Sequence, residues 1–297
     1  MMDTIGVIGI GAMGKGMIGS LLAKGYQVIA YDPVPAAQDW AKEKGAHVAL
    51  SPADVGRTAS VVITSLPGPA IVEQVLLGED GLYSTLAAGS YVLDASTIDP
   101  ATAKRLHAVG LQKGISLFDC PVSGGPAGSA AGTLTIMVGG DESKLPDITP
   151  YLQGIGKDIF YMGESGSGQV AKLCHNSVVA VITAALGEAF TVGAKAGVDP
   201  HKLAAVMDKG SAHNRVLSVF GPNILYGTYE KTVFSLDHMH KDLQLYAQAA
   251  REQQVPVLVG GTVVQLYEAA KAQGKGAWDS SAVCSVTEEL AKATISK

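Results

Sequence analysis

The sequence contains few cysteines. Only Cys120, Cys174 and Cys284 occur among 297 residues, and their spacing matches no metal-binding or redox motif. Disulfide frameworks use larger, even sets, so this odd number is typical of a protein from a reducing compartment. We therefore expect a cytoplasmic protein.

Charge is also scarce. Charged residues make up 16% of the chain against 47% hydrophobic residues, and the formal net charge is −5. No cluster of lysines and arginines occurs, which argues against nucleic acid as the main partner. With so little charge, much surface must be buried, some of it between domains or subunits. A chain of this length suits two domains of ordinary size.

Segments that direct a chain to a membrane are not evident. The apolar N-terminal stretch MMDTIGVIGIGAMG has no basic region and no small-residue cleavage site, so we expect a first strand rather than a signal peptide. No run reaches the roughly 18 uncharged apolar residues of a spanning helix. The stretch 177–187 is too short and ends at Glu188. No membrane partner is expected.

Short β-branched runs alternate with helical patterns in the first half of the chain. This alternation predicts an α/β fold, a Rossmann-type doubly wound and mostly parallel sheet with helices on both faces. Helical patterns between the strands include 14–24 and 70–77. The expected strands are 4–9, 26–32, 60–66, 91–96, 116–121 and 134–140.

The second half is expected to be all helical. Asp199 and Pro200 form an N-cap and a first helical residue, Gly210 ends that helix, and Asp279 or Ser280 caps the last one. The glycine-rich stretch GESGSG near residue 164 is the expected junction. It divides the chain into an NAD-binding Rossmann domain, 1–164, and a helical substrate and dimerisation domain, 165–297. The expected helices are 168–196, 200–209, 240–254, 257–273 and 280–293.

The turn after the first expected strand carries the pattern Gly9-x-Gly11-x-x-Gly14. A strand before it and a helix after it favour dinucleotide binding over an ordinary glycine-rich turn. The first glycine permits the tight turn, the second lets the backbone approach a pyrophosphate, and the third lets helix and strand pack closely. The expected cofactor-binding residues of this turn are Gly9, Ile10, Gly11, Ala12, Met13 and Gly14.

Asp32 ends the second expected strand, close to the ~20-residue spacing of the residue that bonds the ribose hydroxyls. A carboxylate there accepts a hydrogen bond from the 2′-hydroxyl and repels a 2′-phosphate. No arginine follows nearby to receive that phosphate. The sequence therefore favours NAD over NADP. The alternative is a solvated turn residue before Pro33.

Three further stretches follow expected strands: SLPG (65–68), DASTIDP (94–100) and DCPVSGGPAGSAAGTL (119–134). Ligands of open α/β sheets bind beyond the carboxyl ends of the strands, so these stretches are expected to converge near the nicotinamide. Taken alone, each stretch would be interpreted as an ordinary turn. A fourth stretch, GSGQVAKLCHN (166–176), opens a long apolar helix whose residues 178–186 are expected to be buried.

Together these stretches resemble the β-hydroxyacid dehydrogenase family, which contains 3-hydroxyisobutyrate dehydrogenase and tartronate semialdehyde reductase. The resemblance covers essentially the whole chain. It rests on GVIGIGAMG, DASTIDP, DCPVSGG, GSGQVAKLCHN and HKDL (240–243), in the order of the family. It implies an NAD-dependent oxidoreductase that interconverts a small β-hydroxy acid and its semialdehyde.

The resemblance also implies catalytic and substrate-binding residues. Lys172 would be the general acid/base and Asn176, one helical turn later, its orienting neighbour. The substrate carboxylate would be held by Ser123, Gly124 and Gly125.

Cofactor contacts are implied in the same way. Leu66 and Pro67 would line the cofactor, and Thr97 would contact its ribose–nicotinamide part and the substrate. Lys241, with Asp242 beside it, would reach the cofactor from the helical domain.

Physical chemistry supports these roles independently. A serine hydroxyl and the amides of a Gly-Gly turn form a nest for a carboxylate. Hydride transfer belongs to the cofactor, so the protein must manage a proton. Burial disfavours the charged form of a lysine and suits it to acid/base exchange. The alternative for Lys172 is a helix-end lysine with its head in water.

Some polar residues have no assigned role. His175 stands where family members often carry another asparagine, and we expect it to pack rather than to tune the lysine or touch substrate. His238 and His240 have the wrong spacing for one helix face, so no metal site is predicted. The stretch 209–222 is expected to be a solvated interhelical loop. The alternative is that His213, Asn214 or Arg215 reaches the far end of the substrate and sets its specificity. Separately, Phe234 is expected to wall the nicotinamide pocket.

Two other functions stay open. An imine reductase shares the architecture, but those relatives generally lack the lysine. A non-catalytic dinucleotide-binding scaffold would have no need of Lys172, Ser123 or Asn176. The substrate is also open among 3-hydroxyisobutyrate, tartronate semialdehyde or glycerate, serine, 4-hydroxybutyrate or succinic semialdehyde, and glyoxylate. A homodimer or homotetramer is expected.

Overall fold

The computed structural model describes residues 3–296, which form two compact units. The first unit extends to Lys172 and the second begins at Leu173, so the division falls inside the long helix α8 (Ser167–Lys195). The sequence-based limit of the functional domains at 164/165 stays a prediction.

The first unit is built on a nine-stranded sheet of order β3-β2-β1-β4-β5-β6-β8-β7, with β9 also paired to β8. Strands β1 to β6 pair in parallel, whereas β8 is antiparallel to β6 and β7 and parallel to β9. The strands are β1 (Thr4–Ile8), β2 (Gln27–Tyr31), β3 (His47–Val48), β4 (Val61–Thr64), β5 (Tyr91–Asp94), β6 (Ser116–Asp119), β7 (Val122–Ser123), β8 (Leu134–Gly139) and β9 (Gly156–Gly163).

Helices connect these strands, and many of them begin with proline, whose fixed φ suits the first helical turn. Ser51 and Asp99 add side-chain N-caps to α3 and α5. The helices are α1 (Ala12–Ala23), α2 (Pro35–Glu43), α3 (Pro52–Thr58), α4 (Pro69–Leu77), α5 (Pro100–Gln112), α6 (Gly125–Ala131) and α7 (Leu145–Ile155), with the short 3₁₀ turns η1 (Leu82–Ser84) and η2 (Glu142–Lys144).

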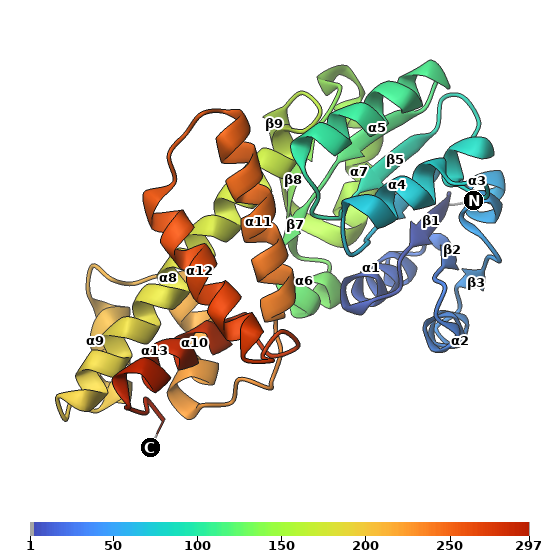
Figure 1. The fold of residues 1–297 in the computed structure, drawn as a ribbon. Helices are drawn as coiled ribbons and strands as arrows, with labels where there is room; N and C mark the ends of the chain where they lie inside the picture. The colour runs from blue at the N-terminus through green and yellow to red at the C-terminus, as the bar shows by residue number, and fades with distance from the viewer. Residues whose placement is uncertain (1–2, 297) are drawn as a thin grey trace. The chain divides into compact units, whose positions relative to one another are not determined.

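The sheet is buried on both faces because successive side chains of each strand enter different cores. In β4, Val61 and Ile63 pack on the side of α1, α2 and α7, whereas Val62 packs on the side of α3, α4 and α5. Figure 1 shows these helices around the sheet. The predicted doubly wound, mostly parallel sheet is confirmed.

The second unit is helical. Besides the rest of α8, it contains α9 (Pro200–Lys209), α10 (Arg215–Tyr226), α11 (Leu236–Glu252), α12 (Leu258–Ala272), the 3₁₀ turn η3 (Ser280–Val283) and α13 (Cys284–Ala291). Its core surrounds the fully buried Phe190, Leu243 and Tyr267. Asp199 caps α9 and Asp279 caps η3, as the sequence predicts.

Some elements differ from the sequence-based expectations. All of the expected strands are present, but the two-residue β3 and β7 and the half-exposed β9 were not foreseen. The stretch 209–222 is not a loop throughout, since α10 begins at Arg215 with Asn214 as its N-cap. Gly221 and Pro222 have low helix propensity, but the burial of apolar side chains on α10 outweighs it. The buried side chains are Val216, Leu217, Phe220 and Ile224.

Helix α8 differs from the expected buried helix. Val178 is 58% exposed, whereas Leu186 and Phe190 are buried. By length and composition, α8 is the one helix among residues 3–296 that could cross a membrane. The core helix of a protein that never enters a membrane meets the same criteria, and half of its apolar window is buried. Its length and composition therefore carry no membrane assignment.

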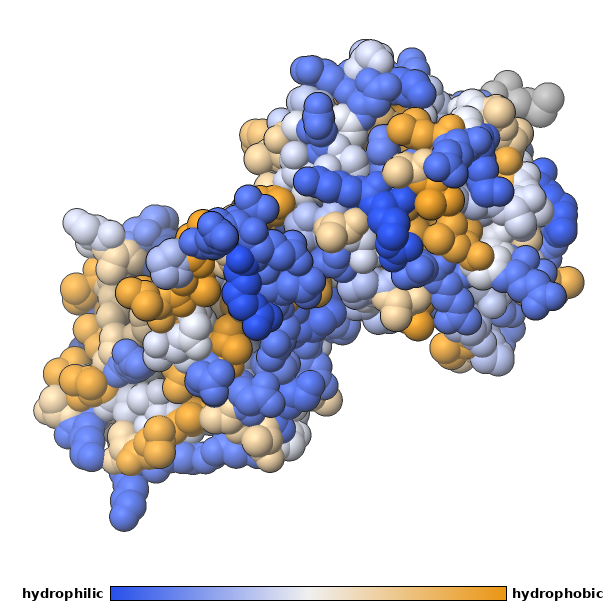
Figure 2. All heavy atoms as spheres, turned by 45° about the horizontal axis from the view of Figure 1, so that its top comes forward, coloured by the Kyte–Doolittle hydropathy of each residue, from blue (hydrophilic) through white to orange (hydrophobic). Residues whose placement is uncertain are grey.

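Large apolar side chains are exposed on both units, and Figure 2 shows such residues in orange among polar ones. In the second unit they lie on several helices rather than on one. They include Val178 and Val192 of α8, Val206 of α9, Leu258 and Val259 of α12, and Leu290 of α13.

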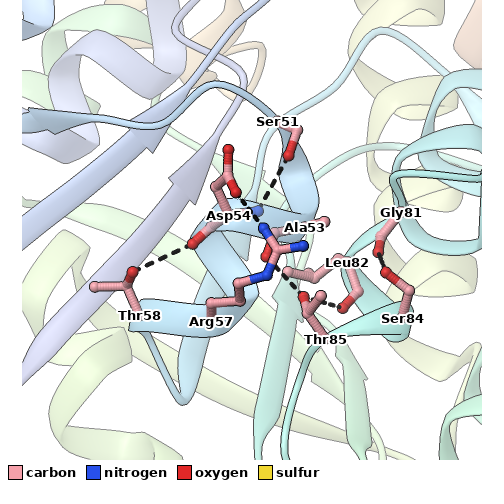
Figure 3. A network of polar contacts seen from close by, with 9 residues as sticks. All are labelled: Ser51, Ala53, Asp54, Arg57, Thr58, Gly81, Leu82, Ser84 and Thr85. Carbon is pink, nitrogen blue, oxygen red and sulfur yellow. Dashed lines mark hydrogen bonds and ion pairs between the residues drawn. The ribbon is translucent and has the colours of Figure 1, made fainter.

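A polar network fastens α3 to η1 in the first unit (Figure 3). The Ser51 hydroxyl accepts a hydrogen bond from the Asp54 amide at 3.2 Å, and Arg57 pairs with the Asp54 carboxylate. The Thr85 hydroxyl donates to the Ala53 carbonyl at 2.7 Å. These contacts hold a connection between β3 and β4 in place without any catalytic side chain.

Close packing of Gly187 in α8 yields the first testable prediction. A Cβ at this position would lie 2.7 Å from Cys284 Sγ and 2.8 Å from Cys284 Cβ. We expect Gly187→Ala to lower the free energy of unfolding by about 1–3 kcal/mol through overpacking. Gly261→Ala, in the open on α12, should instead raise it by up to about 1 kcal/mol. Urea unfolding of both variants checks this, and equal effects would contradict it.

Candidate active site

The dinucleotide turn has two glycines that the fold requires and one that it does not. Gly9 has φ +95°, and a Cβ there would lie 2.2 Å from the Ser65 carbonyl oxygen. A Cβ on Gly14 would lie 1.9 Å from the Gly9 carbonyl oxygen. No described atom outside its chain neighbours lies within 4 Å of a Cβ built on Gly11. The open space at Gly11 fits the approach of a pyrophosphate to the backbone.

Asp32 is tied to this turn. Its Oδ2 accepts a hydrogen bond from the Ile10 amide at 2.7 Å, and its Oδ1 accepts one from the Val34 amide at 2.9 Å. The carboxylate is thus held at the end of β2, next to the glycine turn. Asp32 is therefore a fixed group and not merely a solvated turn residue.

Hydrogen bonds join the next two strand ends. The buried Asp94, the last residue of β5, accepts from the Thr64 hydroxyl at 2.7 Å and from the Ser96 amide at 3.1 Å. The Leu66 amide in turn donates to Ser96 Oγ at 2.9 Å. The SLPG and DASTIDP stretches, which the sequence predicted to converge, are connected by these bonds.

Asp119, the last residue of β6, binds the N-terminus of α8. Its Oδ1 accepts from the Gly166 amide at 2.7 Å and its Oδ2 from the Gln169 amide at 3.0 Å. A carboxylate at a helix N-terminus is favourable because it meets amides without partners in the first turn. The contact fixes the start of the helix that carries Lys172.

Burial raises the pKa of both carboxyls. For Asp94, burial outweighs the hydrogen bonds from Ser96 and Thr64 and raises the pKa to about 6. For Asp119, burial raises the pKa although the amides of Gly166, Gln169 and Gly168 oppose it. The two residues are in register on neighbouring strands, and the charge of Asp119 adds to the rise in the pKa of Asp94.

The Ser123-Gly124-Gly125 turn lies beside the dinucleotide turn. Gly124 and Gly125 have φ values of +133° and +62°, and α6 follows directly. Helix α6 packs so closely on α1 that a Cβ added to Gly16 would lie 2.5 Å from Ser129 Oγ. The Ser129 hydroxyl also donates to the Met13 carbonyl at 2.7 Å. The predicted carboxylate-binding turn and the cofactor turn therefore belong to one packed region.

Lys172 is 8% exposed, so the expectation of a buried lysine agrees with the structure. It lies on α8 at the end of the first unit. Leu66 and Pro67 follow β4, and Thr97 follows β5, at the same edge of the sheet as the glycine turn. The first unit thus holds most of the predicted site residues.

The second unit holds the remaining candidates, and Asp242 connects them. The Asn176 amide donates to Asp242 Oδ2 at 2.6 Å, and Lys241 Nζ lies 3.0 Å from Asp242 Oδ1 as an ion pair. That Oδ1 atom is buried and accepts no hydrogen bond of good geometry. Asp242 is 2% exposed, and of these two neighbours Lys241 carries the opposite charge, whereas Asn176 contributes a neutral hydrogen-bond donor.

The histidines do not form a metal site among residues 3–296, where no group of three or more His, Cys, Asp or Glu could hold an ion. His175, expected to pack, is exposed, with Nδ1 3.0 Å from Asn176 Oδ1, so that expectation is wrong for the single chain. His240 Nε2 lies 2.5 Å from Glu268, and the His238 ring stacks on Phe234 with centroids 5.9 Å apart.

The specificity candidates of the 209–222 stretch have local roles. His213 Nδ1 lies 3.3 Å from an Asp208 carboxylate oxygen, and the Asn214 side chain accepts from the Leu217 amide as an N-cap. Arg215 is the first residue of α10. Their contribution to specificity stays a prediction.

Comparisons with known proteins find matches for both halves of the chain. Residues 4–163 match the family model described as the NAD binding domain of 6-phosphogluconate dehydrogenase. Residues 166–287 match the one described as NAD-binding of NADP-dependent 3-hydroxyisobutyrate dehydrogenase.

Individual proteins are similar to this chain over nearly its whole length. The "Probable 3-hydroxyisobutyrate dehydrogenase, mitochondrial" of Dictyostelium discoideum is 39% identical over 94% of this chain and 89% of its own length. The "NAD-dependent L-serine dehydrogenase" of Pseudomonas aeruginosa is 38% identical over 95% of this chain and 97% of its own. A structure of Mycobacterium tuberculosis 3-hydroxyisobutyrate dehydrogenase with L-serine has a TM-score of 0.88 and 32% identity, covering 97% of this chain and 99% of that one. The chain belongs to the β-hydroxyacid dehydrogenase family.

Sequence reasoning about this β-hydroxyacid dehydrogenase missed three buried residues of its first unit: Asp94, Asp119 and Gln169. A signal for the two aspartates was present, since each directly ends an apolar strand and opens a noted stretch, DASTIDP or DCPVSGG. Gln169 stands within GSGQVAK, but nothing in the sequence reveals its partners.

The glycines of the dinucleotide turn separate ligand binding from folding in this dehydrogenase. Gly11→Ala should leave the melting temperature unchanged and weaken cofactor binding about 10-fold or more, because the new methyl group occupies the space for the pyrophosphate. Gly14→Ala should lower the melting temperature, because its Cβ meets the Gly9 carbonyl. Thermal unfolding and calorimetric titration measure both. A stable Gly11→Ala protein with normal cofactor affinity would contradict the assignment.

The raised pKa of Asp94 predicts a pH-dependent stability. The folded dehydrogenase holds this proton up to about pH 6, whereas the unfolded chain releases it near pH ~4. The free energy of unfolding should therefore fall as the pH rises between these values, by up to about 3 kcal/mol from this group. Asp94→Asn should lack that decline. Urea unfolding from acid to neutral pH tests it, and a constant difference between the two proteins would refute it.

Proposed function

We propose that this protein is an NAD-dependent oxidoreductase that interconverts a small β-hydroxy acid and its semialdehyde. One observation carries the proposal. A buried lysine, Lys172, lies on a helix whose N-terminus is fixed by Asp119 at the carboxyl end of the sheet, the edge where the glycine turn and Asp32 also lie. Family membership supports the reaction class.

The residues for the cofactor are the glycine turn from Gly9 to Gly14, Asp32, the Leu66-Pro67 pair and Thr97. The space at Gly11 and the amides at the start of α1 suit a pyrophosphate. The fixed Asp32 carboxylate suits the ribose hydroxyls of NAD and repels the 2′-phosphate of NADP. When bound, the nicotinamide supplies or accepts the hydride. Lys241 is included as a cofactor ligand on the family resemblance.

The substrate carboxylate is assigned to Ser123, Gly124 and Gly125. The positive φ values of the two glycines allow successive amides to turn toward one anion, and the serine hydroxyl adds a donor. No bulky pocket is needed for such a small acid. Two of the candidate substrates, 3-hydroxyisobutyrate and serine, are the substrates after which relatives of this chain are named.

Lys172 is assigned the proton. During reduction its ammonium donates a proton to the carbonyl oxygen, and during oxidation its amine takes one from the alcohol. Its burial keeps competing water away. Asn176, one turn later on α8, orients the reacting groups, and Asp242 holds its amide at 2.6 Å.

Assembly and location belong to the same proposal. We infer a homodimer or homotetramer, because the second unit exposes large apolar side chains such as Val192, Leu258 and Leu290. A second copy of the chain would remove them from water. The cytoplasmic location is proposed from the cysteines alone, which are few and odd in number.

The test is a panel of small hydroxy acids and semialdehydes with NAD and NADP, followed by the absorbance of the reduced nicotinamide. Turnover with at least one acid is expected, with NAD preferred. Lys172→Ala should lower kcat by about 10²–10⁴-fold and leave NAD affinity within about threefold, because this side chain acts on the substrate proton and not on the dinucleotide.

Lys144→Ala provides a matched control. Lys144 is another partly buried lysine of the first unit, and its Nζ donates to Ser116 Oγ at 2.8 Å, at the opposite end of β6 from Asp119. This variant should keep the wild-type kcat. Cofactor binding without turnover across the panel would favour the scaffold. A set of imines is assayed in parallel, and turnover of imines alone would favour an imine reductase.

A further inference from the structure

Gln169 is a fully buried polar residue, 0% exposed, in the first turn of α8. Its Nε2 donates a hydrogen bond to the Ser96 carbonyl at 2.9 Å, and its Oε1 accepts one from the Ile98 amide at 3.1 Å. Both ends of one carboxamide are therefore engaged by the same short loop. Its own backbone amide donates to Asp119 Oδ2 at 3.0 Å.

The residue between these two partners is Thr97. The Ser96 carbonyl belongs to the peptide group before Thr97, and the Ile98 amide belongs to the peptide group after it. A planar carboxamide that binds both groups restricts φ and ψ of Thr97 together, in the way that a neighbouring strand would. The backbone of Thr97 is thus fixed by a side chain from a helix far along the chain.

Gln169 also stands three residues before Lys172, so the two side chains lie on one side of α8, one turn apart. The turn between them is held at its start by Asp119. Any shift of the Thr97 loop relative to α8 would break the two carboxamide bonds. Thr97 and Lys172 therefore keep a constant relation as long as Gln169 is in place.

We propose that Gln169 is a positioning residue: its carboxamide clamps both peptide groups that flank Thr97 and holds this loop in register with Lys172. The inference rests on the proposed function, which assigns Thr97 to the cofactor and substrate and Lys172 to the proton. Gln169 itself is assigned no contact with the cofactor or the substrate, because it is fully buried and both ends of its carboxamide are already bonded. Its contribution is to the alignment of two groups that must act on one substrate.

A glutamine is needed here because the loop presents one acceptor and one donor. Leucine has nearly the same volume but would leave the buried Ser96 carbonyl and Ile98 amide without partners. Glutamate keeps the acceptor for Ile98 but replaces the donor to Ser96. The two variants Gln169→Leu and Gln169→Glu therefore remove both bonds and one bond, respectively.

The first experiment is amide hydrogen exchange, which needs no substrate. In Gln169→Leu the Ile98 amide should exchange about 10-fold faster or more than in the wild type. The Cys120 amide, which donates to the Asp94 carbonyl at 2.7 Å in the same row of strand ends, should be unchanged. Wild-type protection of Ile98 in Gln169→Leu would overturn the clamp.

The second experiment is steady-state kinetics with the best acid of the panel. Gln169→Leu should lower kcat about 10–100-fold and also weaken cofactor binding, because the released loop carries Thr97. Gln169→Glu should fall between it and the wild type. Tyr83→Phe is the control for lost stability, because it removes another buried bond, from Tyr83 Oη to the Leu106 carbonyl at 3.3 Å, away from the strand ends. It should keep the wild-type kcat.

The outcomes separate the two proposals. Faster exchange at Ile98 with kcat within about twofold of wild type would overturn the positioning role. If the wild-type protein turned over no acid on the panel, the proposed function would fail, and the exchange of Ile98 alone would decide whether the clamp exists.

Discussion

The first unit depends on the Asp119 carboxylate and the N-terminus of α8. A buried carboxylate is costly unless several donors surround it, and the first turn of a helix offers amides that have no partner of their own. Asp119 receives two of them, at 2.7 and 3.0 Å. The contact joins the sheet to the 29-residue helix that carries Lys172, and so it sets where the lysine stands.

The same edge of the sheet is bound together by short polar contacts. Asp32 holds the glycine turn, Asp94 binds the ends of β4 and β5, and Gln169 joins the next loop to α8. Each contact satisfies a polar group that the parallel sheet would otherwise leave unpaired where its strands end. This arrangement lowers the stability of the fold at neutral pH. Burial raises the pKa of both Asp94 and Asp119, so that ionising either carboxyl costs free energy in the folded state. An edge of this kind suits alignment of reactants better than an apolar one.

Sequence patterns were sufficient to predict those features of the fold that depend on residues close together along the chain. The expected strands, the helical second half, the cap at Asp199 and the glycine turn all follow from local periodicity and residue chemistry. Predictions failed where packing decided the outcome. Helix α10 forms despite Gly221 and Pro222 because its apolar side is buried, and His175 is exposed because its side of α8 is not covered within the chain.

By itself the sequence determined the order of the elements, the glycines that shape the cofactor turn, and the one-turn spacing of Lys172 and Asn176. These are properties of adjacent residues and of helix and strand geometry. Only the tertiary structure decided the partners. The amide of Gln169 binds Asp119, which lies 50 residues earlier, and Asn176 binds Asp242, which lies 66 residues later. The physical reason is that a buried polar group takes the nearest complementary group in space, and folding brings that group from a distant part of the chain.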